Sequence, residues 1–257
     1  MTIRTSPWPT GVPCWLDLFS PDLAVAKDFY AGILGWTFLD LGQDFGNYHI
    51  AQRKGHSAAG LAPVMENAPT GWTLYFGSDD LEATARLITG EGGTVVMGPS
   101  EVPGKGRFLI ATDPGGVAFG VWEQRGFIGT ELVNEPGGLV WEQLMSADPA
   151  IAQRFYASVF GWSYDPVEGT DDFVTFKGTG SDPLGGLGGT FGGSPSWSVH
   201  FSVDDTDAAV SFAQRAGGQV IRPAEDTPYG RMAVLMDPFG AAFGVFTAPA
   251  GQPGSDA

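Results

Sequence analysis

Apolar residues follow two periods along this chain, and the changes between the periods predict its elements. From Leu23 to Leu34 apolar side chains recur every three or four residues, the spacing of one face of an α-helix. Shorter runs alternate apolar with other residues, which is the period of a β-strand. Turn signals at 113–116 and 237–240 separate such runs. The order strand, helix and three strands occurs four times and predicts an α+β fold of four βαβββ modules.

Residues that cap helices indicate where the four helices begin and end. Each predicted helix follows an aspartate that can accept hydrogen bonds from the first free backbone amides, and these are Asp22, Asp80, Asp148 and Asp205. The signal at Asp148 is the clearest because Pro149 occupies the first helical position. The helices are expected to stop at glycines, which tolerate the left-handed backbone; these are Gly35, Gly92, Gly161 and Gly217.

The chain repeats itself at an offset of about half its length. Trp15 recurs 126 residues later as Trp141, and Asp113 recurs 124 residues later as Asp237. The small drift in offset fits insertions within a duplicated sequence better than chance. We therefore expect two domains, over 11–125 and 136–248, with the connection near 126–138 and a loose tail after Pro249.

Composition and charge narrow the range of partners. The 257 residues are 43% hydrophobic and 16% charged, which is a globular composition. A formal charge of −16 repels phosphate backbones and anionic lipid, so nucleic acid and membrane are poor partners and a small-molecule ligand is favoured. The single cysteine, Cys14, fits a small buried hydrophobe in a reducing cytoplasm. The chain is expected to be a monomer or a homodimer.

Several motifs together carry a family resemblance. Asp22-Leu23, then Phe29-Tyr30, then Leu34-Gly35-Trp36, and later Asp-Pro-x-Gly before a final strand, resemble the vicinal oxygen chelate superfamily. That group includes glyoxalase I, extradiol dioxygenases and bleomycin-resistance proteins. The chain is most similar to tandem glyoxalase-like proteins of the kind labelled hydroxylases, some of which serve antibiotic biosynthesis. The resemblance implies paired modules whose sheets curl into cups, with the helices outside.

The same resemblance implies positions for a divalent metal, normally held there by histidine or glutamate. In the two halves those positions hold Trp15, Thr73 and Gly120, and Trp141, Ser198 and Gly244. Indole, glycine and a lone hydroxyl are not plausible primary ligands. The histidines lie elsewhere, at His49, His56 and His200. We expect no metal and no cofactor, with His49 and His56 at the surface or at an edge.

Strand alternation separates a helix-packed face from a face that lines the cup. The cup face mixes wide aromatic side chains, small residues and a few polar groups, as small-molecule sites do, and Gly120 and Gly244 are expected to leave space there. The candidates for acid/base catalysis are Asp17, Tyr75 and His200. The candidates for ligand contact are Trp15, Phe19, Trp122, Trp141, Gln143, Met145 and Phe246.

Other interpretations stay open at this level. Asp17 and His200 have structural hydrogen bonding as an alternative role, and Arg107 and Arg231 are expected to pair with acidic side chains. One function is metal-free binding of an aromatic or carbonyl-rich metabolite, with acid/base catalysis in antibiotic metabolism left open. The alternatives are a non-catalytic sequestration or resistance protein, and a metal-dependent lyase or dioxygenase.

Overall fold

A computed structural model describes residues 3–64, 70–170 and 172–249, which leaves the expected tail after Pro249 outside the described residues. Each half contains two βαβββ modules, as the periodicity predicts. The first half comprises β1 (Pro13–Ser20), α1 (Leu23–Leu34), β2 (Thr37–Asp40), a short 3-10 helix (Gln43–Phe45), β3 (His49–Arg53), β4 (His56–Pro63), β5 (Gly71–Gly77), α2 (Leu81–Gly90), β6 (Thr94–Val102), β7 (Gly106–Thr112) and β8 (Ala118–Gln124). The second half comprises β9 (Leu139–Ser146), α3 (Pro149–Phe160), β10 (Ser163–Pro166), β11 (Val174–Lys177), β12 (Gly185–Gly189), β13 (Ser196–Ser202), α4 (Thr206–Arg215), β14 (Gln219–Thr227), β15 (Gly230–Met236) and β16 (Ala242–Thr247).

Each half forms one mixed sheet of eight strands. The order in the first sheet is β2-β3-β4-β1-β5-β8-β7-β6, and the second sheet repeats it as β10-β11-β12-β9-β13-β16-β15-β14. In the first sheet β1 runs parallel to β4 and antiparallel to β5, while β5 runs parallel to β8. Two modules therefore join along β1 and β5, and the fold of four modules in two sheets is confirmed.

The helix caps follow the sequence signals closely. All four aspartates accept backbone amide hydrogen bonds at the start of their helices. Gly35 and Gly161 end α1 and α3 in the left-handed conformation, as expected. The expectation for α2 and α4 is wrong by one residue, because Glu91 and Ala216 are the caps there and the expected glycines follow them.

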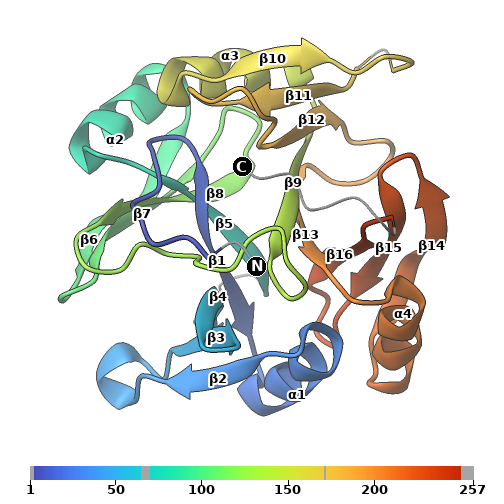
Figure 1. Cartoon of the computed structure of the whole chain (residues 1–257). Coiled ribbons are helices and arrows are strands. Elements are labelled where there is room, and N and C mark those ends of the chain that lie inside the picture. Colours follow the sequence, from blue (N-terminus) through green and yellow to red (C-terminus); the bar gives the residue numbers. More distant parts are fainter. Residues whose placement is uncertain (1–2, 65–69, 171, 250–257) are drawn as a thin grey trace.

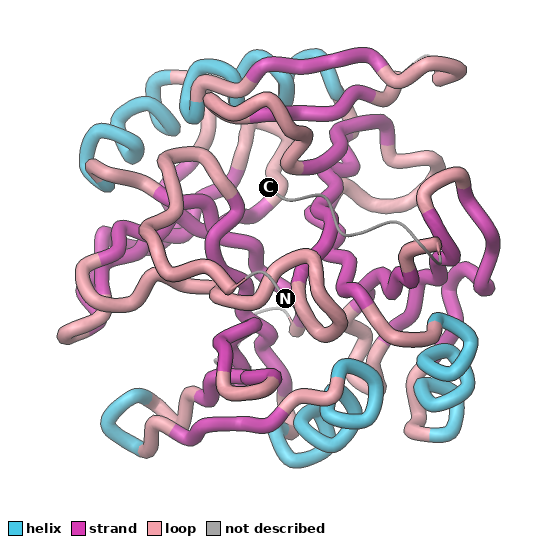
Figure 2. The backbone as a smooth tube through the Cα atoms, viewed as in Figure 1, coloured by secondary structure: helices cyan, strands magenta, loops and turns pink. Residues whose placement is uncertain are grey.

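The two sheets pack with their apolar faces toward each other. Figures 1 and 2 show the central strands β1, β5, β9 and β13 in the middle of the molecule, with α1 beside α4 on one flank and α2 beside α3 on the opposite flank. Aromatic side chains of the two central strands meet across this interface: the ring centroids of Phe76 and Trp197 lie 5.2 Å apart, as do those of Trp72 and Phe201. One hydrophobic core consequently includes residues from both halves.

Hydrogen bonds across the interface come in matching pairs. The Tyr30 hydroxyl donates to Asp237 at 3.2 Å, and the Tyr156 hydroxyl donates to Asp113 at 3.4 Å. Two tryptophans form a second matching pair. The Trp36 indole N–H donates to the Gly137 carbonyl at 2.7 Å, and the Trp162 indole N–H donates to the Gly11 carbonyl at 2.8 Å. The halves are therefore related by an approximate two-fold axis, and their concave faces open in opposite directions (Figure 1).

No helix in the described ranges is long and apolar enough to cross a membrane.

Candidate ligand-binding site

The face of each sheet that lies opposite the helices is the candidate site, and strand alternation determines its residues. Leu16, Leu74 and Phe76 are fully buried in the core shared by the two sheets. Trp15, Tyr75 and Trp122 alternate with such residues and form a separate cluster on the concave face. Tyr75 belongs to this separate cluster, and its counterpart His200 lies opposite Trp141 and beside Gly244 on the equivalent face of the second sheet.

A β-bulge brings Cys14 to the same concave face. The pairing of β1 with β5 shifts between Pro13 and Trp15, and Cys14 joins the cluster of Trp15 and Tyr75. Its side chain is 1% exposed, and burial raises the pKa of the thiol far above its ordinary value. A neutral, enclosed thiol is a poor nucleophile, so Cys14 acts as the small buried hydrophobe that the sequence indicated.

On the first concave face, Asp17 lies at the centre of a hydrogen-bonded cluster. The Trp15 indole donates to its carboxylate at 2.9 Å, and the Tyr48 hydroxyl donates to the same oxygen. Burial raises the pKa of the Asp17 carboxyl, and hydrogen bonds from Tyr48, Tyr75 and Trp15 offset part of that rise. The contacts favour the structural interpretation of Asp17 that the sequence left open.

Phe127, in the connection between the halves, covers the first concave face. Its ring meets Trp15 edge-on with centroids 4.9 Å apart, and its carbonyl accepts a hydrogen bond from the Trp122 indole at 2.9 Å. The backbone amides of residues 125–127 all donate to the Lys105 carbonyl. This aromatic ring contacts both Trp15 and Trp122 on the concave face, and sequence periodicity could not assign it there.

The space expected beside Gly120 and Gly244 is already filled. A Cβ atom at Gly120 would overlap the Tyr75 ring, and one at Gly244 would overlap the His200 imidazole. These glycines admit the neighbouring rings and do not open volume for a ligand. The expectation of empty space at these two positions is therefore wrong.

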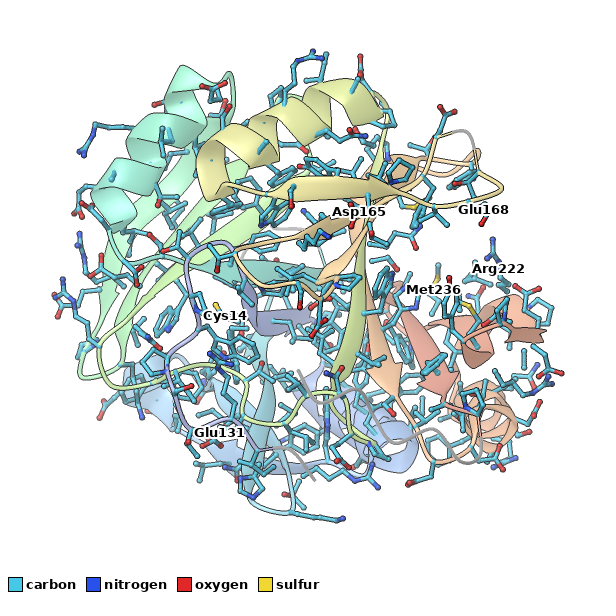
Figure 3. All side chains as sticks on the ribbon, turned by 45° about the horizontal axis from the view of Figure 1, so that its top comes forward. Cys14, Glu131, Asp165, Glu168, Arg222 and Met236 are labelled. Atoms are coloured by element: carbon cyan, nitrogen blue, oxygen red, sulfur yellow. The ribbon has the colours of Figure 1, made fainter. Side chains whose placement is uncertain are left out.

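The second concave face is more open to solvent than the first. Its partly exposed residues include four predicted ligand contacts, Trp141, Gln143, Met145 and Phe246. By contrast, Trp15 and Asp17, the first-half counterparts of Trp141 and Gln143, are 5% and 7% exposed. Figure 3 shows Met236 and Arg222 on β15 and β14 at the same opening, with Asp165 and Glu168 across from them.

His200 lies in the floor of this second face as a neutral imidazole. It is 7% exposed, and its Nε2 lies 3.3 Å from the Ser198 hydroxyl oxygen. Burial, and secondarily the positive charge of Arg222, lowers the pKa of His200 to about 4. At neutral pH the ring therefore carries one N–H donor and one acceptor nitrogen and no charge.

The strand register shows which of the metal positions implied by the resemblance lie opposite one another in neighbouring strands. Trp15 is paired with Tyr75, and Tyr75 with Gly120, so these three form one row across the sheet. Thr73 lies instead in the next row, opposite Asp17. The second sheet repeats this arrangement, with His200 in the row and Ser198 outside it.

The donor chemistry of these rows does not fit a divalent metal. The row in the first half offers an indole, a phenol and a glycine, and the row in the second half offers an indole, one imidazole and a glycine. In the described part of the chain, no group of three or more histidine, cysteine, aspartate or glutamate side chains is placed to hold a metal ion.

The remaining sequence candidates have mixed outcomes. Phe19 is partly exposed near the end of β1. Arg107 and Arg231 form ion pairs with acidic residues on α2 and α4, so the expected pairing is confirmed. The expectation that His49 lies at the surface or at an edge is wrong: β3 lies between β2 and β4, His49 is 6% exposed, and its Nε2 lies 3.1 Å from the Lys27 ammonium nitrogen. His56, at the start of β4, is partly exposed.

Comparison with known proteins agrees with this architecture. Residues 14–121 match the model of the Glyoxalase/Bleomycin resistance protein/Dioxygenase superfamily, and residues 143–246 match that of a glyoxalase-like domain. The Mycobacterium tuberculosis protein "Putative glyoxylase CFP32" is 36% identical over 252 residues, which cover 94% of this chain and 97% of that protein. The chain belongs to the glyoxalase superfamily.

Other relatives of this glyoxalase-superfamily chain extend the comparison. The anthracycline biosynthesis protein DnrV of Streptomyces peucetius is 35% identical over 264 residues, with 95% of each chain covered. The Mn(II)-bound glyoxalase of Novosphingobium aromaticivorans has a TM-score of 0.69 at 16% identity, over 93% of this chain and 82% of that one. The 2,3-dioxygenase LapB of Pseudomonas sp. KL28 has a TM-score of 0.66 at 14% identity, over 98% and 96%. At such low identity the solved structures show a shared fold.

Proposed function

We propose that the second half of this glyoxalase-superfamily protein binds a planar, aromatic or carbonyl-rich small molecule without a metal. The observation that carries the proposal is the difference between the two concave faces. Phe127 covers the first face, whereas Trp141, Gln143 and Ser198 stay partly exposed on the second. A flat indole beside amide and hydroxyl groups suits a ring system with carbonyl oxygens.

Relatives named for anthracycline biosynthesis support the same ligand class. Anthracyclines are planar fused-ring molecules that contain quinone carbonyls, and DnrV matches this chain over nearly its full length. We place the protein in metabolism that handles such aromatic compounds.

Binding is better supported than acid/base catalysis. A general base works best with a pKa near the working pH, and the His200 imidazole, with a pKa of about 4, is too weak a base at neutral pH. Asp17 and Tyr75 are enclosed in the hydrogen-bonded cluster under Phe127. The metal-dependent lyase or dioxygenase alternative lacks suitable ligands in both rows.

A pair of tryptophan variants tests the proposal. Trp141→Leu removes the exposed indole while keeping an apolar side chain, and Trp15→Leu makes the same change on the covered face. With 9,10-anthraquinone-2-carboxylate as probe, calorimetry is expected to give one site per chain. Because aromatic stacking contributes roughly 0.5–1.5 kcal/mol beyond area burial, Trp141→Leu should weaken binding about two- to tenfold.

Trp15→Leu serves as the matched control and should leave the affinity within about twofold, because its indole has no free face for a ligand. Circular dichroism establishes that each variant is folded. Unchanged affinity in Trp141→Leu, or two equal sites in the unmodified protein, would contradict the assignment to the second half.

A further inference from the structure

A continuous row of paired residues crosses the second sheet and ends in an arginine. Trp141 is paired with His200, and His200 with Gly244. Gly244 is paired with Val234, and Val234 with Arg222 at the edge strand β14. Residues opposite each other in adjacent strands share a face. Arg222 therefore belongs to the same face as Trp141 and His200.

The burial of residues on the neighbouring strand β15 shows that this is the concave face. Ala233 and Leu235 are fully buried in the core between the sheets, whereas Val234 between them is partly exposed. In Figure 3 the Arg222 side chain projects from β14 toward the opposite rim, where Asp165 and Glu168 lie. The guanidinium thus stands at the opening of the second concave face.

The guanidinium is weakly engaged within the protein. Its ion-pair partner, Glu225, is 3.8 Å away, and the two side chains are 58% and 53% exposed. Exposed pairs of this kind contribute little. Across the opening, Asp165 is already paired with Lys177. Arg222 therefore keeps donors available for another anionic group.

The first half has no equivalent of this charge. The corresponding row runs from Trp15 through Tyr75 and Gly120 to Ile110 and Met97. Met97 occupies the place of Arg222 and is 40% exposed. At this position of the row the two faces therefore differ, with a cation on the second face and an uncharged side chain on the first.

We propose that Arg222 selects ligands that carry an anionic oxygen, as a carboxylate or an ionised acidic phenol, at the end of the ring system remote from Trp141. This inference rests on the proposed function of the second face. Four strand steps of about 4.8 Å separate Trp141 from Arg222 along the sheet, so the stacked rings and the anionic group belong to opposite ends of the ligand. Arginine presents a planar fork of donors that matches a carboxylate.

Two matched probes test the selection. The first is 9,10-anthraquinone-2-carboxylate, and the second is 2-(hydroxymethyl)anthraquinone, which has the same rings without the charge. In 50 mM NaCl at pH 7.5 the protein should bind the carboxylate at least fivefold more tightly. The preference should shrink in 300 mM NaCl because salt screens exposed charges.

Arg222→Gln should abolish the preference while leaving the affinity for the neutral probe within about twofold. Arg215→Gln, on the exposed surface of α4, removes the same charge elsewhere and should retain the preference. Equal affinity of the unmodified protein for both probes, or a preference that survives Arg222→Gln, overturns the role of Arg222 and leaves the proposed function intact. Failure of both probes to bind overturns the proposed function and this inference together.

Discussion

Glu142 is a carboxylic acid at a position where the first half has a leucine. It lies on β9 between Val199 of β13 and Gly185 of β12, on the apolar face of the second sheet. Its counterpart Leu16 is fully buried, and Glu142 itself is 6% exposed. Because burial disfavours the charged form, the pKa of Glu142 is raised from 4.5 to about 8.

This group should make stability depend on pH. In the unfolded chain the carboxyl ionises at its ordinary pKa of 4.5, whereas the folded protein holds the proton until about pH 8. Between these values the unfolded state binds fewer protons, so the free energy of unfolding falls as pH rises, by about 1.4 kcal/mol per pH unit from this group. Below pH 4.5 the group has no effect.

Glu142→Gln removes the titration and should be more stable than the unmodified protein at pH 8, with the advantage vanishing near pH 4.5. Urea unfolding of both proteins at several pH values between 4.5 and 8.5 measures the difference, in which all other titrating groups cancel. A constant difference across this range would show that Glu142 is not held neutral.

At the scale of elements, the connection after β8 is bound to the first half by backbone hydrogen bonds. The backbone amide of Thr130 donates to the Cys14 carbonyl, and that of Glu131 donates to the Ser57 carbonyl. Gly129 has a φ of +96°, and a Cβ there would overlap the Cys14 carbonyl. This close approach to β1 requires glycine and holds Phe127 over the concave face.

Removing the ring of Phe127 should loosen this cover. Because the side chain is only partly buried, Phe127→Ala should cost roughly 1–3 kcal/mol of unfolding free energy, less than the 3–5 kcal/mol typical of a fully buried phenylalanine. Acrylamide should also quench more tryptophan fluorescence, since Trp15 loses its cover. Denaturant unfolding and quenching titrations measure the two effects.

Phe191→Ala is the matched control. Phe191 is 72% exposed in the loop between β12 and β13, so its loss should change stability by no more than about 0.5 kcal/mol and leave quenching unaltered. Equal effects in the two variants would show that Phe127 does not cover Trp15.

The elements that sequence predicts well are those determined by near neighbours. The βαβββ order, the aspartate caps and the two faces of β1, β5 and β13 all follow from local periodicity. The positions of Tyr48 and Phe127 could not be predicted in this way, because only tertiary packing brings them to Asp17 and Trp15. The face on which Arg222 lies could not be predicted for a different reason. The pairing of β14 with β15 is irregular on both sides of Arg222, so alternation cannot be counted along that strand.

At the scale of the whole molecule, the two halves share one interior. The core joins Phe76 of β5 to Trp162 and Trp197, and Phe201 of β13 to Trp36 and Trp72. Neither sheet would keep its apolar face covered without the other. The chain should therefore unfold in one cooperative transition, and calorimetry should give equal calorimetric and van't Hoff enthalpies. Two separated heat absorption peaks would show instead that each half is stable alone.

The reciprocal hydrogen bonds across the interface bear on how the chain arose. Tyr30 reaches Asp237 as Tyr156 reaches Asp113, and Trp36 reaches Gly137 as Trp162 reaches Gly11. A contact in which each surface patch meets its own equivalent is the signature of a two-fold homodimer. This arrangement is the one expected if a self-associating half-length protein was duplicated and joined end to end. Within a single chain, unlike in a homodimer, the two equivalent faces can carry different residues, as they do here with Met97 on one face and Arg222 on the other.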